Sequence, residues 1–381
     1  MSKIQILRQA RILMIVGGVW KIPFSKNPNI YTLYKIYAYV IQLFYVLVAC
    51  CMFIEFFYLL NSEDVKKLTD NLKITISCSL VAVKALIFQA GAFPKLVKNM
   101  IAEEKNILES SNDEIKTLYW KFVSYINKCA TGILVVAGVT AVLLVIAGSV
   151  IGLMNKSETK PMLFLAHFPF DQQKHYKASM IIQMISVVIA TTYFCMSQIF
   201  YLCILTFVKA KLKILQVHLK HFKNESGISN VKKINNFIKL HQNIISFVGD
   251  LNKSIKYLLL IEFLLSSVNI ASVTYQLISA STIADLLFSF TYLMLLIGQL
   301  FILAWHANEI KVESIAVSDA IYQSHWYETD INTQKLIFMI ILRSHRPLLL
   351  TIGPFKPLTT HTVISVMNAA YSFIMVMTSS N

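Results

Sequence analysis

The chain has 381 residues, of which 56% are apolar and only 14% charged, and its mean hydropathy is +0.60. A soluble domain carries about 25% charged residues, because its surface must face water. The composition therefore excludes an ordinary soluble enzyme and a disordered chain, and it indicates an integral membrane protein. The net charge of +15 is spread between long apolar runs, which argues against nucleic-acid binding.

Patterns for targeting, metal binding or catalysis are not found. No small-residue cleavage site follows the apolar run 12–20, so no signal peptide is predicted. The six cysteines lie in apolar segments without a Cys-x-x-Cys pair, which argues against a disulfide framework or a zinc site. Phosphate-loop, dinucleotide-binding, zinc-protease and nucleophile-elbow motifs are absent. We therefore expect neither an enzyme nor a cofactor.

Seven runs in the sequence are long enough to cross a bilayer, which takes about 20 apolar residues. We predict an all-α membrane protein, because the alternating pattern of a β-barrel is missing. The predicted spans are residues 33–60, 69–92, 126–154, 177–208, 256–280, 284–306 and 357–378.

The basic residues predict the orientation of these spans, because Lys and Arg accumulate in cytoplasmic loops. One set of loops holds 24 Lys and Arg and the opposite set holds 6. The N-terminus is then cytoplasmic and the C-terminus extracellular, which places the glycosylation acceptor Asn155 outside. The larger set comprises residues 1–30, 93–125, 209–256 and 306–346.

Helical periodicity continues beyond the membrane on the basic side. Apolar residues recur at helical spacing in 209–223 and in 234–248, and Trp326–Arg343 reads as an amphipathic helix. These segments predict a cytoplasmic helix bundle. The helix of 326–343 is broken by Arg343–Pro347 and a span restarts at Pro357, so we expect a split seventh helix.

Glu55, Lys84 and Glu262 are ionisable residues that interrupt the predicted spans, where charge is costly. Lys84 and Glu55 lie near span ends, and their side chains are expected to extend to the membrane surface. A Lys84–Glu262 ion pair is the alternative, since both residues lie in the inner half. Four glycines of the third span, Gly132, Gly138, Gly148 and Gly152, predict either close helix packing or room for a ligand.

The C-terminal third resembles the insect odorant receptor family, and the resemblance extends over about residues 165–378. The middle of the chain contributes Pro169-Phe170-Asp171, Leu212–Leu215, His241-Gln242 and Leu251-Asn252. The C-terminal part is the more specific and contributes Gln299, Trp305, Asn308-Glu309, Ser314, Ala320–Tyr322, Trp326-Tyr327, Arg343–Leu348, Leu350–Phe355, Pro357-Leu358 and Tyr371–Phe373.

The resemblance implies a subunit of a ligand-gated, non-selective cation channel at the plasma membrane. It implies a tetramer in which tuned subunits assemble with an odorant co-receptor, and a small volatile ligand that binds in the outer half of the membrane. On this plan residues 1–208 form the ligand-binding half, 209–356 the anchor with spans five and six, and 357–381 the pore-lining helix.

The family's pocket lies in the outer halves of spans two, three, four and six. Transferred to this sequence, it predicts ligand contacts at Ser77, Leu80, Val81, Thr140, Leu144, Ala147, Met180, Gln183, Met184, Tyr275 and Phe288. The last span predicts a pore stripe with an apolar gate at Met375, and the stripe comprises Tyr371, Met375, Thr378 and Ser379.

Two other classes of protein remain as alternatives. A metabotropic seven-helix receptor has the opposite orientation and carries an Asn-Pro-x-x-Tyr motif. The similar stretch Asn368–Tyr371 of this chain lacks the proline. A small-molecule transporter would show paired broken helices, and the glycines and prolines here do not form such pairs.

Overall fold

A computed structural model describes residues 5–22, 27–61, 65–91, 93–154, 162–222, 227–280 and 282–379. It is helical almost throughout, and six of the described helices are long and apolar enough to cross a membrane. Its helices are α1 (Arg8–Val16), α2 (Pro28–Leu60), α3 (Val65–Gln89), α4 (Phe93–Leu108), α5 (Asp113–Met154), α6 (Tyr176–Lys220), α7 (Gly227–Ile278), α8 (Ile283–Tyr322), α9 (Ile331–Ser344) and α10 (Thr360–Ser379).

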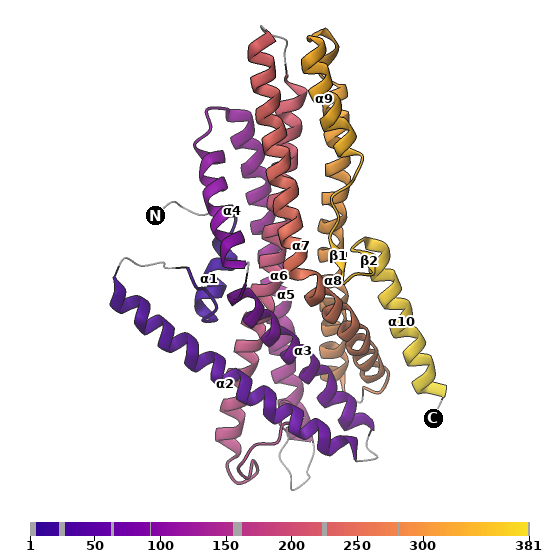
Figure 1. Cartoon of the computed structure of the whole chain (residues 1–381). Helices are drawn as coiled ribbons and strands as arrows, with labels where there is room; N and C mark the ends of the chain where they lie inside the picture. The colour runs from indigo at the N-terminus through magenta and orange to yellow at the C-terminus, as the bar shows by residue number, and fades with distance from the viewer. Residues whose placement is uncertain are drawn as a thin grey trace.

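The predicted spans correspond to α2, α3, α5, α6, α7, α8 and α10. Helices α6, α7 and α8 have 45, 52 and 40 residues, so at 1.5 Å per residue each is much longer than a bilayer is thick. Figure 1 shows their extra length at the upper end, where α9 lies, while α10 runs beside the lower half. The predicted bundle outside the membrane is therefore present.

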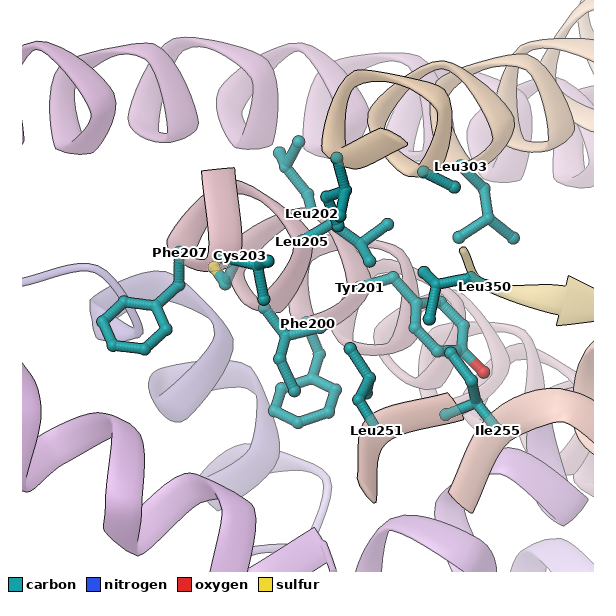
Figure 2. Close-up of a cluster of buried hydrophobic side chains, with 14 of the residues drawn as sticks. Phe200, Tyr201, Leu202, Cys203, Leu205, Phe207, Leu251, Ile255, Leu303 and Leu350 are labelled. Atoms are coloured by element: carbon teal, nitrogen blue, oxygen red, sulfur yellow. The ribbon is translucent and has the colours of Figure 1, made fainter. Parts of the chain in front are cut away.

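Helix α6 is the centre of the fold. Residues 195–208 are buried without interruption, as expected for a helix that is apolar on all sides. Figure 2 shows this core, where Phe200, Tyr201 and Leu205 of α6 meet Leu251 of α7 and Leu303 of α8. Leu350, in the segment after α9, joins the same cluster, so the core links the long helices to the connection that leads to α10.

Ion pairs hold the bundle beyond the membrane together. Lys211 of α6 pairs with Glu103 of α4, and Lys213 of α6 pairs with Glu313 of α8 at 2.7 Å. Glu104 of α4 accepts backbone hydrogen bonds from Gln5 at 3.0 Å and Ile6 at 2.9 Å, which fixes the N-terminal segment. Burial raises the pKa of the Glu104 carboxyl, and the two donated N–H groups oppose this rise.

The connection between α9 and α10 differs from the sequence prediction. The predicted helix 326–343 is divided into a short turn at Trp326–Glu328 and α9, because the Asp330 side chain accepts from the backbone N–H of Thr333 and begins a new helix there. A two-stranded hairpin, β1 (Thr351–Ile352) with β2 (Lys356–Pro357), precedes α10, which begins at Thr360 and not at Pro357.

This hairpin is fastened to α7. The Gly353 N–H donates to the Lys256 carbonyl at 2.8 Å, and the Thr351 N–H donates to the Asn252 side chain at 2.8 Å. Gly353 has a φ of +57° and a Cβ at this position would lie 3.0 Å from Leu260, so only glycine fits without strain. These hydrogen bonds join α7 to the segment that leads into the base of α10.

Two expectations about the spans need correction. The Lys84 side chain is 1% exposed and does not reach a membrane surface, because it pairs with Glu262 of α7 at 2.5 Å. A Cβ on Gly132 or Gly138 of α5 would meet nothing within 4 Å, so these glycines do not serve close packing within the chain. Neither of them lines the cavity described below. The surroundings of Gly148 and Gly152, and the whole of Asn155, fall outside the part that the structure describes.

Candidate functional site: an apolar cavity and the exposed face of the last helix

An internal cavity of about 130 Å³ lies between five of the long helices, near the end of the molecule opposite α9. Its walls come from α2, α3, α5, α6 and α8, and Phe164 closes it from the segment before α6. The lining residues are Tyr45, Val48, Ala49, Met52, Ile74, Ser77, Cys78, Val81, Ala137, Thr140, Ala141, Leu144, Phe164, Ser186, Val187, Ala190, Thr191, Phe194, Phe288, Tyr292 and Leu295.

Three of the four serine and threonine hydroxyls in the wall are already satisfied by their own helices. Thr140 donates to the Val136 carbonyl at 2.9 Å and Ser186 to the Ile182 carbonyl at 2.7 Å, four residues earlier in each helix. Thr191 does the same to Val187 at 2.8 Å. These hydroxyls therefore present mainly carbon to the cavity.

One corner of the cavity is polar. The Ser77 hydroxyl of α3 lies 2.5 Å from the Tyr292 hydroxyl of α8, and the Asn269 amide of α7 donates to Ser77 at 2.7 Å. Phe288 stacks on Tyr292 at 5.6 Å, with the Lys73 ammonium 5.3 Å from the Phe288 ring. An apolar chamber with a single hydroxyl corner fits a small, largely apolar molecule that carries one polar group.

The last helix presents one face to its neighbours and leaves the other open. Val363, Val366 and Ala370 are buried, whereas Tyr371 is 62% exposed and Met375 is 52% exposed. Ile364 and Met367 continue the exposed stripe toward the start of α10. The side chains of Thr378 and Ser379 lie outside the described part of the chain. The exposed face of α10 is therefore apolar at Ile364, Met367 and Met375 and carries the Tyr371 ring.

Comparison with known proteins decides the family. A sequence profile described as "7tm Odorant receptor" matches residues 64–371, most of the chain. This chain belongs to the insect odorant receptor family. Its seven-helix membrane fold is that of a solved insect olfactory receptor, OR5 from Machilis hrabei in complex with eugenol, with a TM-score of 0.84 over 98% of both chains and 15% identity.

Curated odorant receptors match part of the sequence. Odorant receptor 10 from Aedes albopictus is 31% identical over 178 residues, which are 46% of this chain and 48% of that one. Odorant receptor Or2 from Anopheles gambiae is 30% identical over 136 residues, 36% of each chain. The matched region thus spans about half or less of the length of these relatives, which are all named as receptors.

The structure brings five of the predicted ligand contacts of this odorant receptor to the cavity: Ser77, Val81, Thr140, Leu144 and Phe288. Leu80 lines a smaller cavity of about 40 Å³ next to it, which shares Ser77, Val81, Phe194 and Tyr292 with the larger one. The side chain of Ala147 is not among those described.

The remaining predicted contacts lie elsewhere. Gln183 is buried, but its amide accepts from the Leu163 N–H at 2.8 Å and donates to the Phe164 carbonyl at 3.0 Å, so it fixes the segment before α6. Met184 is 40% exposed on the outer surface, one residue further along the helix. Met180 packs against an apolar cluster that includes the cavity-lining residues Val48, Met52 and Phe164. Neither Met180 nor Tyr275 is itself part of the cavity wall.

Sequence reasoning missed the contribution of the first span. Tyr45, Val48, Ala49 and Met52 of α2 line the cavity, although the predicted pocket used only later spans. Their spacing of three to four residues was a usable signal, because it defines one helix face. Nothing local in the sequence marks Phe164, whose place depends on the hydrogen bonds to Gln183.

Proposed function

We propose that this receptor is the ligand-binding subunit of a ligand-gated, non-selective cation channel. The supporting observation is the cavity of about 130 Å³, which is partly open to the outside and apolar except at the Ser77–Tyr292 corner. An apolar cavity of about 150 Å³ in another protein holds benzene, so a ligand with one ring or a short chain matches this volume. Small apolar volatiles are the proposed ligand class.

Opening of the channel would follow from the contacts of α7 and α10. The cavity wall includes α3 and α8, both of which pack against α7, and α7 holds the hairpin before α10 through Lys256 and Asn252. A ligand that shifts α3 or α8 therefore acts on the base of α10. The pore itself is proposed to form where the exposed stripes of several subunits meet.

The proposed partner is the odorant co-receptor, with this chain as a tuned subunit in a heterotetramer. The division of the chain into a ligand-binding half (1–208), an anchor region (209–356) and a pore helix (357–381) is part of the same proposal. Because Phe288, Tyr292 and Leu295 of α8 also line the cavity, the ligand-binding region includes part of the second segment.

The experiment is a panel of apolar volatiles applied to cells that express this chain together with a co-receptor. We expect inward cation currents for a subset of the panel and none in cells that express the co-receptor alone with the same compounds. Binding without current, or a response that needs a G protein, would contradict the proposal.

The gate is tested by Met375→Ser. Met375 is on the exposed stripe of α10, where a ring of apolar side chains closes a narrow pore by excluding water. A serine ring should admit water and raise the ligand-free current several-fold, with ligand sensitivity retained. Met339→Ser on α9, also an exposed methionine, serves as control and should leave the baseline silent. A silent Met375→Ser channel with unchanged ion permeability would place Met375 outside the pore.

The proposed orientation is tested by tags at the two ends of the chain. Because 24 of 30 loop Lys and Arg lie on one side, the N-terminal tag should be cytoplasmic and the C-terminal tag extracellular. Antibody binding on intact cells should detect the C-terminal tag alone. Detection of this tag only after permeabilisation would reverse the topology and favour the metabotropic alternative.

A further inference from the structure

Three polar contacts join α3 to α7 at different heights, and we refer to them as the polar seam. Lys73 bonds Gln276, Ser77 accepts from Asn269, and Lys84 pairs with Glu262. The α7 members are seven residues apart, so they lie on one face of that helix. Only the middle contact reaches the cavity, because Ser77 lines the wall and no described residue of α7 does.

Ser77 differs from the other hydroxyl residues of the wall. Thr140, Ser186 and Thr191 each donate to the carbonyl four residues earlier, whereas the Ser77 hydroxyl is turned toward Tyr292 and Asn269. The carbonyl four residues before Ser77 is that of Lys73. A serine in a helix takes that local bond readily unless another partner holds the side chain away. Asn269 is such a partner.

The Asn269 amide acts here as a donor. Its nitrogen donates to Ser77, while its Oδ1 is buried without a partner among the described residues. Either hydroxyl can donate in the Ser77–Tyr292 contact. With Ser77 accepting from Asn269, donation from Ser77 to the Tyr292 oxygen leaves the Tyr292 proton available for another acceptor. Its acceptor in the protein is the Lys73 carbonyl at 3.5 Å, which is too long for a good hydrogen bond.

We propose that Asn269, a residue outside the cavity, sets the preference of this receptor for ligands with a hydrogen-bond acceptor, because it positions Ser77 so that Tyr292 can donate to the ligand. This rests on the proposed function of the cavity. The ligand class is a small apolar body that carries a ketone, aldehyde, ester or ether oxygen. Without Asn269, Ser77 turns to the Lys73 carbonyl and Tyr292 donates to Ser77, so no donor remains for the ligand.

The test compares pairs of compounds of equal shape in which a carbonyl oxygen is replaced by a methylene group, such as acetophenone and α-methylstyrene, or 2-octanone and 2-methyl-1-octene. Currents are recorded from the full chain with its co-receptor. In the unmodified receptor, the ketone of each active pair should reach half-maximal current at a concentration about tenfold or more below that of the hydrocarbon. The reason is that the hydrocarbon leaves the Tyr292 hydroxyl unpaired. In Asn269→Leu the two members should differ by less than about threefold.

The hydrocarbon is the internal control, because a general loss of folding lowers both responses. Ser272→Ala removes a buried hydroxyl of α7 that bonds its own helix at 2.9 Å, and it should leave the ratio unchanged. Lys84–Glu262 and Lys73–Gln276 still hold the polar seam in Asn269→Leu, and Asn269→Ala provides a second, smaller variant. Tyr292→Phe removes the donor itself and should reproduce the loss of preference.

The outcomes separate this inference from the proposed function. An unchanged ratio in Asn269→Leu and Asn269→Ala, or equal potency of ketone and hydrocarbon in the unmodified receptor, overturns the role of Asn269 while the cavity stands. Absence of any response to both members of every pair overturns the cavity and the inference together.

Discussion

Ala137→Phe should raise the ligand concentration for half-maximal current roughly 100-fold or abolish the response, while delivery to the cell surface is retained. Ala137 lines the cavity from α5 and is 4% exposed, so an added ring must enter the chamber. A phenyl ring takes up most of a volume of about 130 Å³ and leaves no place for a ligand of that size. Dose–response curves with surface labelling measure both effects.

Met184→Ala is the matched control for the cavity. The sequence predicts Met184 in the pocket, but its side chain is 40% exposed on the outer surface of α6. The structure therefore predicts that Met184→Ala leaves the rank order of active ligands unchanged. Normal sensitivity in Ala137→Phe, together with an altered rank order in Met184→Ala, would show that the sequence-based pocket is right and the cavity is not the site.

Lys84→Met should prevent stable folding. Lys84 and Glu262 are each 1% exposed and 2.5 Å apart, so removal of the lysine leaves a buried carboxylate with no countercharge. Breaking one partner of a buried pair costs about 3–5 kcal/mol, which is a large part of the 5–15 kcal/mol that stabilises an ordinary domain. We expect loss of the receptor from the cell surface and a lower melting temperature in detergent.

The double variant Lys84→Met with Glu262→Met distinguishes charge from packing. Replacing both members of a buried pair by apolar residues of similar volume is often neutral or stabilising, so surface delivery should return. Glu262→Met alone should be as damaging as Lys84→Met, because it leaves an unpaired ammonium 5.6 Å from the Tyr201 ring. If either single variant is as stable as the unmodified chain, the ion pair has no structural role.

The arrangement of spans could be predicted because bilayer thickness and backbone hydrogen bonding leave few choices. Long apolar runs predicted α2, α3, α5, α6, α7 and α8, whereas α4 lies in the predicted loop 93–125 and was missed. The pairing of Lys84 with Glu262 was foreseeable from their shared depth. The helix break at Asp330 was also foreseeable, since Asp is a preferred N-cap residue, yet the apolar periodicity of 326–343 concealed it.

The cavity was harder to predict because residue type does not tell which way a side chain points in lipid. Gln183 looked like a ligand anchor, since a buried amide needs partners, but the backbone of Leu163 and Phe164 already supplies them. Met184 follows Gln183 directly and faces outward, because successive residues of a helix point in different directions. Asn269 could not be recognised, because its role depends on two residues 192 and 23 positions away in the chain.

The central claim is that a ligand in the cavity opens a pore formed by the receptor itself. Recording from excised membrane patches that contain this chain and the co-receptor, in solutions free of nucleotides, tests it most directly. We predict ligand-evoked cation current in these patches, present in Met184→Ala and lost in Ala137→Phe. Current that disappears on excision and returns only with added nucleotide would contradict a ligand-gated channel and support a metabotropic receptor.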